Sequence, residues 1–230
     1  IFYEEAIMSQ PLADLLRPKT FDDVIGNERL IHLLKQLISK DQLTSLILYG
    51  PTGVGKTTLA RIIASQYPLK HFNFNASTDN KKTLRDIIES AKHYDHTLLF
   101  IDEIHRMNRD IQDFLLPYVE KGVIVMIGLT TENPYISVNP AVRSRVSIFK
   151  LTKPSTEDIK NYLKTLDLSS IKKTLKIDDE VYHLIAVAAN NEVRSAINML
   201  ELVIQASDKE HITTDELDQY LPQAQISAYK

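Results

Sequence analysis

The stretch GPTGVGKTT, residues 50–58, constrains this chain more than any other part of it. It follows the apolar run 46–49, which predicts a short buried strand, and it leads into 58–66, which predicts a helix. Glycines let main-chain N–H groups turn toward an anion, and the first turn of a helix adds partial positive charge there. A glycine loop between a strand and a helix therefore predicts a site for a polyphosphate.

The residue types within this loop suit ATP and Mg²⁺. Lys56 is expected to reach the outer phosphates, and the Thr57 hydroxyl is expected to ligate the metal ion. The alternative, a glycine-rich turn with a chance lysine, is disfavoured by the predicted strand and helix on either side. The other loop residues expected to bind the nucleotide are Gly50, Pro51, Thr52, Gly53, Val54, Gly55 and Thr58.

A second predicted strand, 97–102, ends in acidic residues. In a parallel sheet, its carboxyl end lines the same crevice as the glycine loop. Asp102 is then placed to hold Mg²⁺ through water, and Glu103 to orient and deprotonate the attacking water of a hydrolysis. A salt-bridged Asp-Glu pair at a strand end is the alternative, and it would be preferred if the upstream loop were missing.

Apolar segments alternate with helical periods up to about residue 150. The predicted strands are 46–49, 71–75, 97–102, 123–131 and 146–151, and the predicted helices are 28–40, 58–66, 81–94 and 109–122. Strands that are apolar nearly throughout are buried on both faces, which indicates an α/β, doubly wound parallel sheet of five strands. After 153–155 the remaining periods are helical, at 156–166, 178–189, 191–206 and 213–221. We therefore predict a nucleotide-binding core over 9–152 and a small all-helical lid domain over 153–230, with 1–8 as an N-terminal extension.

Composition excludes several classes of site. The chain has no cysteine, so disulfides, thiolate metal sites and cysteine nucleophiles are excluded. No apolar run approaches the ~20 residues of a membrane helix, and the acidic N-terminus does not resemble a signal peptide, so a cytosolic protein is expected. The net charge of −3 means that any nucleic-acid contact must come from a local patch or from an assembly.

Two segments hold arginines that suit a phosphoryl-transfer site. NPAVRSRVSIF (139–149) places Arg143 and Arg145 just before a predicted strand, and NNEVRSAINMLE (190–201) places Arg194 in the first turn of a predicted helix. A guanidinium group is planar and always charged, so it can stabilise charge on a leaving phosphoryl group. From residue chemistry alone, a solvated arginine near the end of an element is the preferred interpretation of each.

The order of these motifs resembles an AAA+ ATPase. The chain is similar over about 9–205 to the replication-associated recombination protein A family, bacterial relatives of clamp loaders and of the Werner-helicase-interacting ATPase. The blocks that carry this resemblance are PLADLLRPKTFDDVIGNERL, SLILYGPTGVGKTTLA, LLFIDEIHRMNRDIQDFLLPYVEKGVIVMIGLTTENPY and NPAVRSRV. The long middle blocks are specific, whereas the glycine loop alone would not be.

The resemblance implies roles for residues outside the loop. Thr131 matches the polar sensor at the end of the fourth strand, with Thr130 the near alternative. Arg145 resembles the finger given to the ATP of a neighbouring subunit, and Arg194 resembles the lid sensor that touches the bound phosphates. Asn75 is similar to an asparagine that holds the catalytic glutamate inactive. The residues that resemble an adenine-packing segment are Arg17, Pro18, Val24, Ile25 and Gly26.

The resemblance also implies partners. The assembled protein is expected to act on DNA at stalled replication forks, on duplex ends or single-strand junctions, as a homo-oligomer, a tetramer at full length. Single-strand-binding protein or other replisome components are expected partners, with no membrane contact and a nucleoid-associated location in the cytoplasm. ATP is expected where core and lid meet. The chain departs from the family pattern at Asn27, at Asn191-Glu192, and in ending before the family's C-terminal oligomerisation domain, so it is expected to be truncated.

Two other functions compete with this hypothesis. In the first, GPTGVGKT and DEIH fit the first two motifs of a DExH-type helicase, which needs a second nucleotide-fold domain. The second is a nucleotide-binding scaffold with little hydrolysis. His105 and Arg106 either relay the nucleotide state or cap a turn, and both interpretations stay open. We interpret His93 and His96 as a solvated loop and Met107 and Met126 as core, and charge is the only reason to connect Lys81, Lys82 or Arg85 with DNA.

Overall fold

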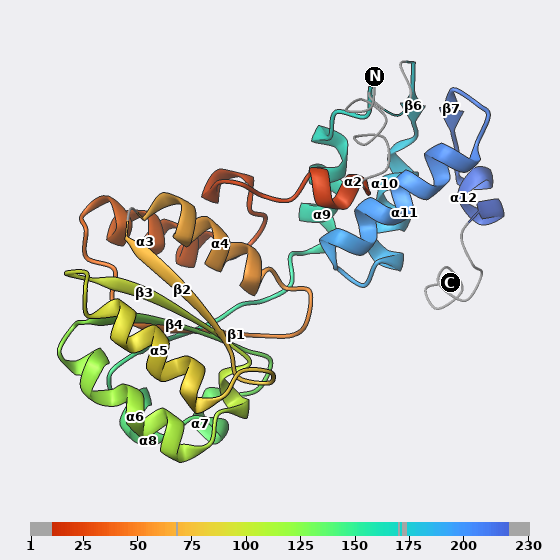
Figure 1. Ribbon diagram of the computed structural model, residues 1–230. Helices are drawn as coiled ribbons and strands as arrows, with labels where there is room; N and C mark the ends of the chain where they lie inside the picture. The colour runs from red at the N-terminus through yellow and green to blue at the C-terminus, as the bar shows by residue number, and fades with distance from the viewer. Residues whose placement is uncertain (1–10, 68, 170, 172–173, 221–230) are drawn as a thin grey trace, which may run out of the picture. The chain divides into compact units, whose positions relative to one another are not determined.

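The computed structural model describes residues 11–67, 69–169, 171 and 174–220 (Figure 1). The chain forms two compact units. The sheet unit is Pro18–Thr152, and the helical unit combines Lys153 onward with the described part of the segment that ends at Arg17. Each unit buries apolar clusters of its own.

The sheet unit is built on five parallel strands in the order β2-β3-β4-β1-β5. The strands are β1 (Leu46–Tyr49), β2 (Lys70–Asn75), β3 (Thr97–Asp102), β4 (Ile124–Thr130) and β5 (Ser147–Lys150). The three central strands are apolar almost throughout because helices cover both of their faces. The α/β class and the five-stranded parallel sheet predicted from the sequence are confirmed.

Helices cover the two faces of this sheet. In Figure 1, α3 and α4 lie on one face and α5 and α6 lie on the other. Leu34 of α3 and Ile63 of α4 belong to one buried cluster, whereas Leu84 of α5 and Leu115 of α6 belong to the other. The helices of this unit are η1 (Phe21–Asp23), α3 (Glu28–Ser39), α4 (Lys56–Gln66), α5 (Lys81–Ala91), η2 (Ile104–Arg106), α6 (Arg109–Glu120), α7 (Pro134–Ser137) and α8 (Pro140–Arg143).

The helical unit differs in two ways from what the sequence predicts. It contains a parallel ladder of β6 (Lys176–Ile177) with β7 (His211–Ile212), which is too short to give a sequence pattern. Helix α2 (Leu12–Leu15), which we counted with the core over 9–152, buries Leu12 and Ala13 in the cluster of the helical unit. The other helices are α9 (Thr156–Thr165), α10 (Asp179–Ala188), α11 (Val193–Ala206) and α12 (Thr214–Tyr220). Among the described residues, no helix has the length and apolar character that crossing a membrane requires.

Candidate nucleotide site

The glycine loop leaves the end of β1 and enters α4. Gly50 has no room for a side chain, because a Cβ there would lie 2.6 Å from the carbonyl oxygen of Leu151. Gly55 has a φ of 96°, a left-handed conformation that favours glycine, and it is the N-cap of α4. Helix α4 therefore starts at Lys56, and its unpaired N–H groups face the loop.

The Lys56 side chain turns back over this loop. Its Nζ donates hydrogen bonds of 2.8 Å to the carbonyl oxygen of Gly50 and 2.9 Å to that of Pro51. Burial lowers the pKa of Lys56, and the negative charges of Glu103 and Asp102 act in the opposite direction. The ammonium group of the glycine loop therefore lies within electrostatic reach of the two acids, at the carboxyl end of the parallel strands.

The acids at the end of β3 lie on a sharp turn. Glu103 adopts a left-handed conformation with a φ of 53°, and its N–H donates a 3.0 Å hydrogen bond to Asp102 Oδ1. A non-glycine residue pays about 1–2 kcal/mol for this conformation. The next residue, Ile104, is buried, which anchors the turn. Strained residues of this kind cluster at functional sites, where surrounding structure holds them.

The end of β4 offers two threonines with different surroundings. Thr130 ends the strand and is 1% exposed, whereas Thr131 follows the strand and is exposed. The Thr130 hydroxyl lies 2.9 Å from Nδ1 of His105 and accepts a 3.0 Å hydrogen bond from the N–H of Glu132. Of the two threonines that we considered for the polar sensor, Thr130 is therefore the one with a buried contact to the turn after β3.

Arg143, the last residue of α8, and Arg145, which follows α8, both have partners within the sheet unit. Arg145 forms an ion pair with Glu120 of α6 and donates 2.8 Å hydrogen bonds to the carbonyl oxygen of Ala141 and to Ser144 Oγ. Arg143 Nε donates a 3.1 Å hydrogen bond to the carbonyl oxygen of Val138. These contacts tie both guanidinium groups to their own unit, and nothing in the sequence pattern pointed to Glu120 as a partner.

Arg194 lies in the first turn of α11 in the helical unit. Its side chain is 58% exposed, and Nη2 lies 3.1 and 3.3 Å from the two carboxylate oxygens of Asp14. Arg17 Nη2 lies 3.1 Å from the same carboxylate. Asp14 of α2 therefore holds two arginines to which the resemblance gives nucleotide-binding roles, and no local sequence pattern predicts this pairing.

The turn before α11 shows how the structure accommodates Asn191, where the chain departs from the family pattern. Asn190 and Asn191 both adopt left-handed conformations, with φ values of 51° and 57°, which asparagine tolerates better than most residues. The Asn191 amide nitrogen donates a 3.0 Å hydrogen bond to the carbonyl oxygen of Pro154, and its oxygen accepts a 3.0 Å hydrogen bond from the Thr156 hydroxyl. An asparagine here keeps the turn of a glycine and adds a tie to the start of α9.

The segment that resembles the adenine-packing region lies before α3. Pro18, Val24 and Ile25 are half-buried, and Gly26 and the N-cap Asn27 have left-handed φ values of 72° and 57°. The Asn27 amide exchanges 3.0 Å hydrogen bonds with the main chain of Thr152. The departure from the family pattern at Asn27 thus ties the segment before α3 to Thr152, two residues after the end of β5.

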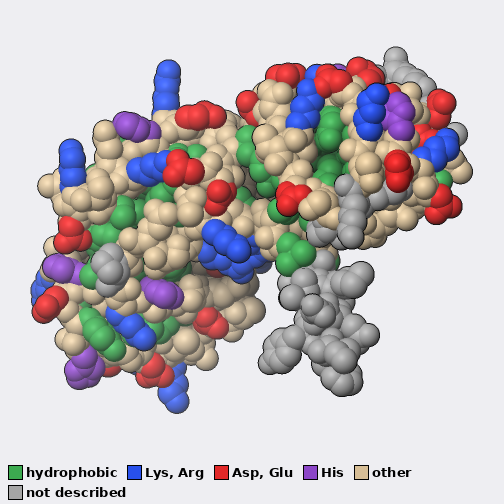
Figure 2. Space-filling model, turned by 90° about the horizontal axis from the view of Figure 1, so that it is seen from above, with side chains coloured by type: hydrophobic (Ala, Val, Ile, Leu, Met, Phe, Trp, Pro, Cys, Tyr) green, Lys and Arg blue, Asp and Glu red, His purple; other side chains and the backbone are tan. Residues whose placement is uncertain are grey.

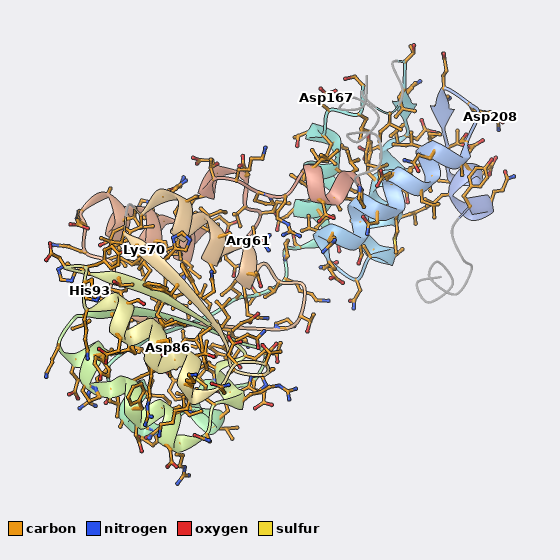
Figure 3. The ribbon with its side chains drawn as sticks, viewed as in Figure 1. Arg61, Lys70, Asp86, His93, Asp167 and Asp208 are labelled. Carbon is orange, nitrogen blue, oxygen red and sulfur yellow. The ribbon has the colours of Figure 1, made fainter. Side chains whose placement is uncertain are left out.

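Of the other sequence candidates, Asn75 at the end of β2 lies opposite Asp102 in the sheet. The side-chain oxygen of Asn75 accepts a 2.8 Å hydrogen bond from Ser77 N in its own turn. His93 is exposed at the edge of the sheet unit just after α5 (Figure 3), and the described residues hold no group of three or more histidines and acids able to bind a metal ion. Met107 and Met126 are buried core residues. Lys81 and Arg85 each lie 5.9 Å from the ring of Phe114.

Comparison with known proteins finds a family match that covers these elements. Residues 46–154, from β1 to just past β5, match the family model "ATPase family associated with various cellular activities (AAA)". The chain contains an AAA ATPase domain. This match includes the glycine loop, the acids after β3 and the end of β4.

Relatives extend the similarity to most of the chain. Replication-associated recombination protein A of Bacillus subtilis is 36% identical over 95% of this chain and 55% of its own length, and the ATPase WRNIP1 of Dictyostelium discoideum is 37% identical over 91% of this chain and 25% of its own. The chain thus spans about half, or less, of the curated relatives it matches. The structure of the Thermotoga maritima RuvB Holliday junction branch migration motor matches with a TM-score of 0.75 and 26% identity over 89% of this chain and 72% of that one. These homologues confirm the resemblance stated from the sequence and the AAA+ fold.

Proposed function

We propose that the AAA domain of this chain binds ATP with Mg²⁺ at the loop Gly50–Thr58 and hydrolyses it. Lys56 and the loop N–H groups hold the phosphates, and Thr57 and Asp102 hold the ion. The oxygen donors of these two residues suit Mg²⁺, which prefers hard oxygen ligands and keeps several waters. When bound, the ion neutralises charge that develops on the phosphates.

One observation carries this proposal most: the half-buried Lys56 ammonium donates to the carbonyl oxygens of Gly50 and Pro51 within the glycine loop, near the acids Asp102 and Glu103. An anion at the loop would take the place of the carbonyl oxygens that now accept from Nζ, because charge-assisted hydrogen bonds are stronger than neutral ones. Glu103 then orients and deprotonates the attacking water. A scaffold without hydrolysis has no need of this acid beside the loop.

The role of the whole protein is proposed from its relatives. Their names connect them with replication-associated recombination and with branch migration of Holliday junctions. We propose that this protein couples ATP hydrolysis to work on DNA, at the stalled forks that the family resemblance implies. It does so as a homo-oligomer in which Arg145 contributes to the ATP of a neighbour and Arg194 responds to the bound phosphates. On the face shown in Figure 2, basic side chains are interspersed with acidic ones. Because the net charge of the chain is −3, we assign DNA contact to the assembly.

Glu103→Gln tests the hydrolysis step. In the full-length protein we expect kcat for ATP to fall roughly 10²- to 10⁴-fold, the range of a lost general base, while magnesium-dependent ATP binding persists. Glu157→Gln, an exposed acid on α9, is the matched control and should keep the wild-type rate. Equal rates for Glu103→Gln and wild type would remove Glu103 from catalysis.

A panel of DNA structures tests the biological role. We expect ATP hydrolysis by the full-length protein to be stimulated by forked or single-strand-junction DNA more than by intact duplex. A rate that no DNA structure changes would instead favour a protein-remodelling ATPase. The AAA match already disfavours the DExH-type helicase that the sequence left open.

A further inference from the structure

His105, in the η2 turn, is enclosed by side chains at the end of the sheet. Its side chain is only 8% exposed. Nδ1 lies 2.9 Å from the Thr130 hydroxyl and 3.2 Å from a carboxylate oxygen of Glu103, and Nε2 lies 3.7 Å from a carboxylate oxygen of Glu132. The ring therefore connects the acid after β3 with the end of β4.

The partners of Nδ1 determine which ring nitrogen carries the proton. A carboxylate oxygen can only accept, so a bare nitrogen facing Glu103 would be repelled and an N–H is attracted. The Thr130 hydroxyl accepts from the N–H of Glu132 and has that residue's carbonyl oxygen 3.4 Å away for its own proton. Thr130 can therefore accept a second hydrogen bond, from an Nδ1–H that also faces Glu103, while Nε2 faces the more distant Glu132 carboxylate at 3.7 Å.

These contacts distinguish the two roles that the sequence left open for His105. A residue that caps a turn binds main-chain groups, whereas the ring of His105 contacts three side chains: that of Glu103, the N-cap residue of η2, and those of Thr130 and Glu132 beyond it. Glu103 needs such a partner, because its own side chain is about one-third exposed and its backbone turn is strained. Asn75, which the resemblance suggested as the residue that holds this glutamate inactive, uses its side-chain oxygen within its own turn.

We propose that His105 is a positioning residue that holds the Glu103 carboxylate in its reactive orientation, anchored by Thr130 at the end of β4. This rests on the proposed role of Glu103 in hydrolysis. A general base contributes only when it is within hydrogen-bond reach of the water it activates. His105 touches neither ATP nor water in this scheme and acts only through Glu103.

The test uses variants that keep one ring nitrogen at a time. The amide of His105→Asn reproduces the Nδ1 donor, that of His105→Gln reproduces Nε2, and His105→Leu removes both. In the full-length protein we expect His105→Leu and His105→Gln to lower kcat about tenfold or more, the effect of one hydrogen bond to a charged group, with the Kd for ATP within about twofold of wild type. His105→Asn should recover most of kcat, and His96→Asn, at an exposed histidine, should match wild type.

Each outcome separates this proposal from the proposed function. Wild-type kcat in His105→Leu, together with an inactive Glu103→Gln, overturns the role of His105 and leaves hydrolysis by Glu103 intact. A Glu103→Gln protein as active as wild type overturns the proposed function itself. If His105→Leu does not fold, the comparison of Asn with Gln decides: equal loss of kcat in both contradicts positioning through Nδ1, and recovery in Asn alone supports it.

Discussion

Lys56 of the sheet unit and Arg194 of the helical unit both point to phosphate chemistry, yet they are held in different ways. Lys56 donates to two main-chain carbonyl oxygens of its own loop. Arg194 is largely exposed and pairs with the Asp14 carboxylate. Main-chain geometry fixes the first cation, and a single side chain holds the second.

The difference indicates which cation can change partner at low cost. An exposed ion pair contributes about 0–1 kcal/mol, so Arg194 can leave Asp14 for another anion with little penalty. The loop around Lys56 keeps its shape because Gly50 packs against Leu151 and Gly55 starts α4. We therefore expect Lys56 to be the fixed cation and Arg194 to be the responsive one.

The largest expected effect tests whether the helical unit depends on its own core. Leu200→Ala removes a fully buried side chain of α11 and should lower the free energy of unfolding by about 2–5 kcal/mol. Leu202→Ala, on the same helix but 48% exposed, is the control and should change it by less than about 0.5 kcal/mol. Urea denaturation followed by circular dichroism measures both, and equal losses would contradict the described packing of α11.

Lys56→Ala removes the fixed cation. We expect the affinity for magnesium-ATP to fall roughly 10- to 100-fold, since hydrogen bonds to charged groups contribute about 1.5–3 kcal/mol. Lys82→Ala, at an exposed lysine on α5, should bind as wild type does. Isothermal titration calorimetry measures both, and unchanged binding by Lys56→Ala would refute the assignment of the loop.

High pH should lower the stability of the sheet unit, and low pH should lower that of the helical unit. In the sheet unit, burial and a 2.6 Å hydrogen bond to Asp41 raise the pKa of Tyr67 to about 12. A raised tyrosine pKa gives stability that is complete below its ordinary value, about 10, and is lost as the pH rises through 12. Tyr67→Phe should therefore show less loss of stability between these two values than wild type does.

In the helical unit, the Lys209 ammonium and the Thr213 hydroxyl and N–H lower the pKa of Glu216 to about 2. A lowered carboxyl pKa gives stability that is present above its ordinary value, about 4.3, and is lost as the pH falls toward 2. Glu216→Gln should flatten this acid limb and leave the alkaline limb unchanged. Chemical denaturation across the pH range measures both limbs, and an acid limb that persists in Glu216→Gln would exclude this residue as its cause.

The smallest expected effect concerns the responsive cation. Asp14→Asn removes the charge that holds Arg194, so the affinity for ATP should rise by no more than about fivefold, the equivalent of an exposed ion pair of ~1 kcal/mol. Asp208→Asn, labelled in Figure 3 and exposed in the same unit, should leave the affinity unchanged. The gain should vanish in an Arg194→Ala background, and a gain that persists there would show that Asp14 acts through another group.

Much of the sheet unit could be predicted because its signals are local. The apolar strands, the glycine loop and the acids after β3 each depend on a few consecutive residues, and the parallel order of strands brings their ends together. The short β6–β7 ladder and the packing of α2 with the helical unit could not be predicted, because two-residue strands and a single helical turn carry too little periodicity.

The sequence by itself determined the strand–loop–helix order that shapes the phosphate loop, with Lys56 and the two acids beside it, because backbone conformation there follows from glycine and strand periodicity. Tertiary structure alone decided the partners of the charged side chains. Asp14 and Arg194 are 180 residues apart in the sequence. His105 and Thr130 are 25 residues apart, and they meet because β3 and β4 are neighbouring strands. Such pairs depend on how separate elements pack, and no local pattern encodes that packing.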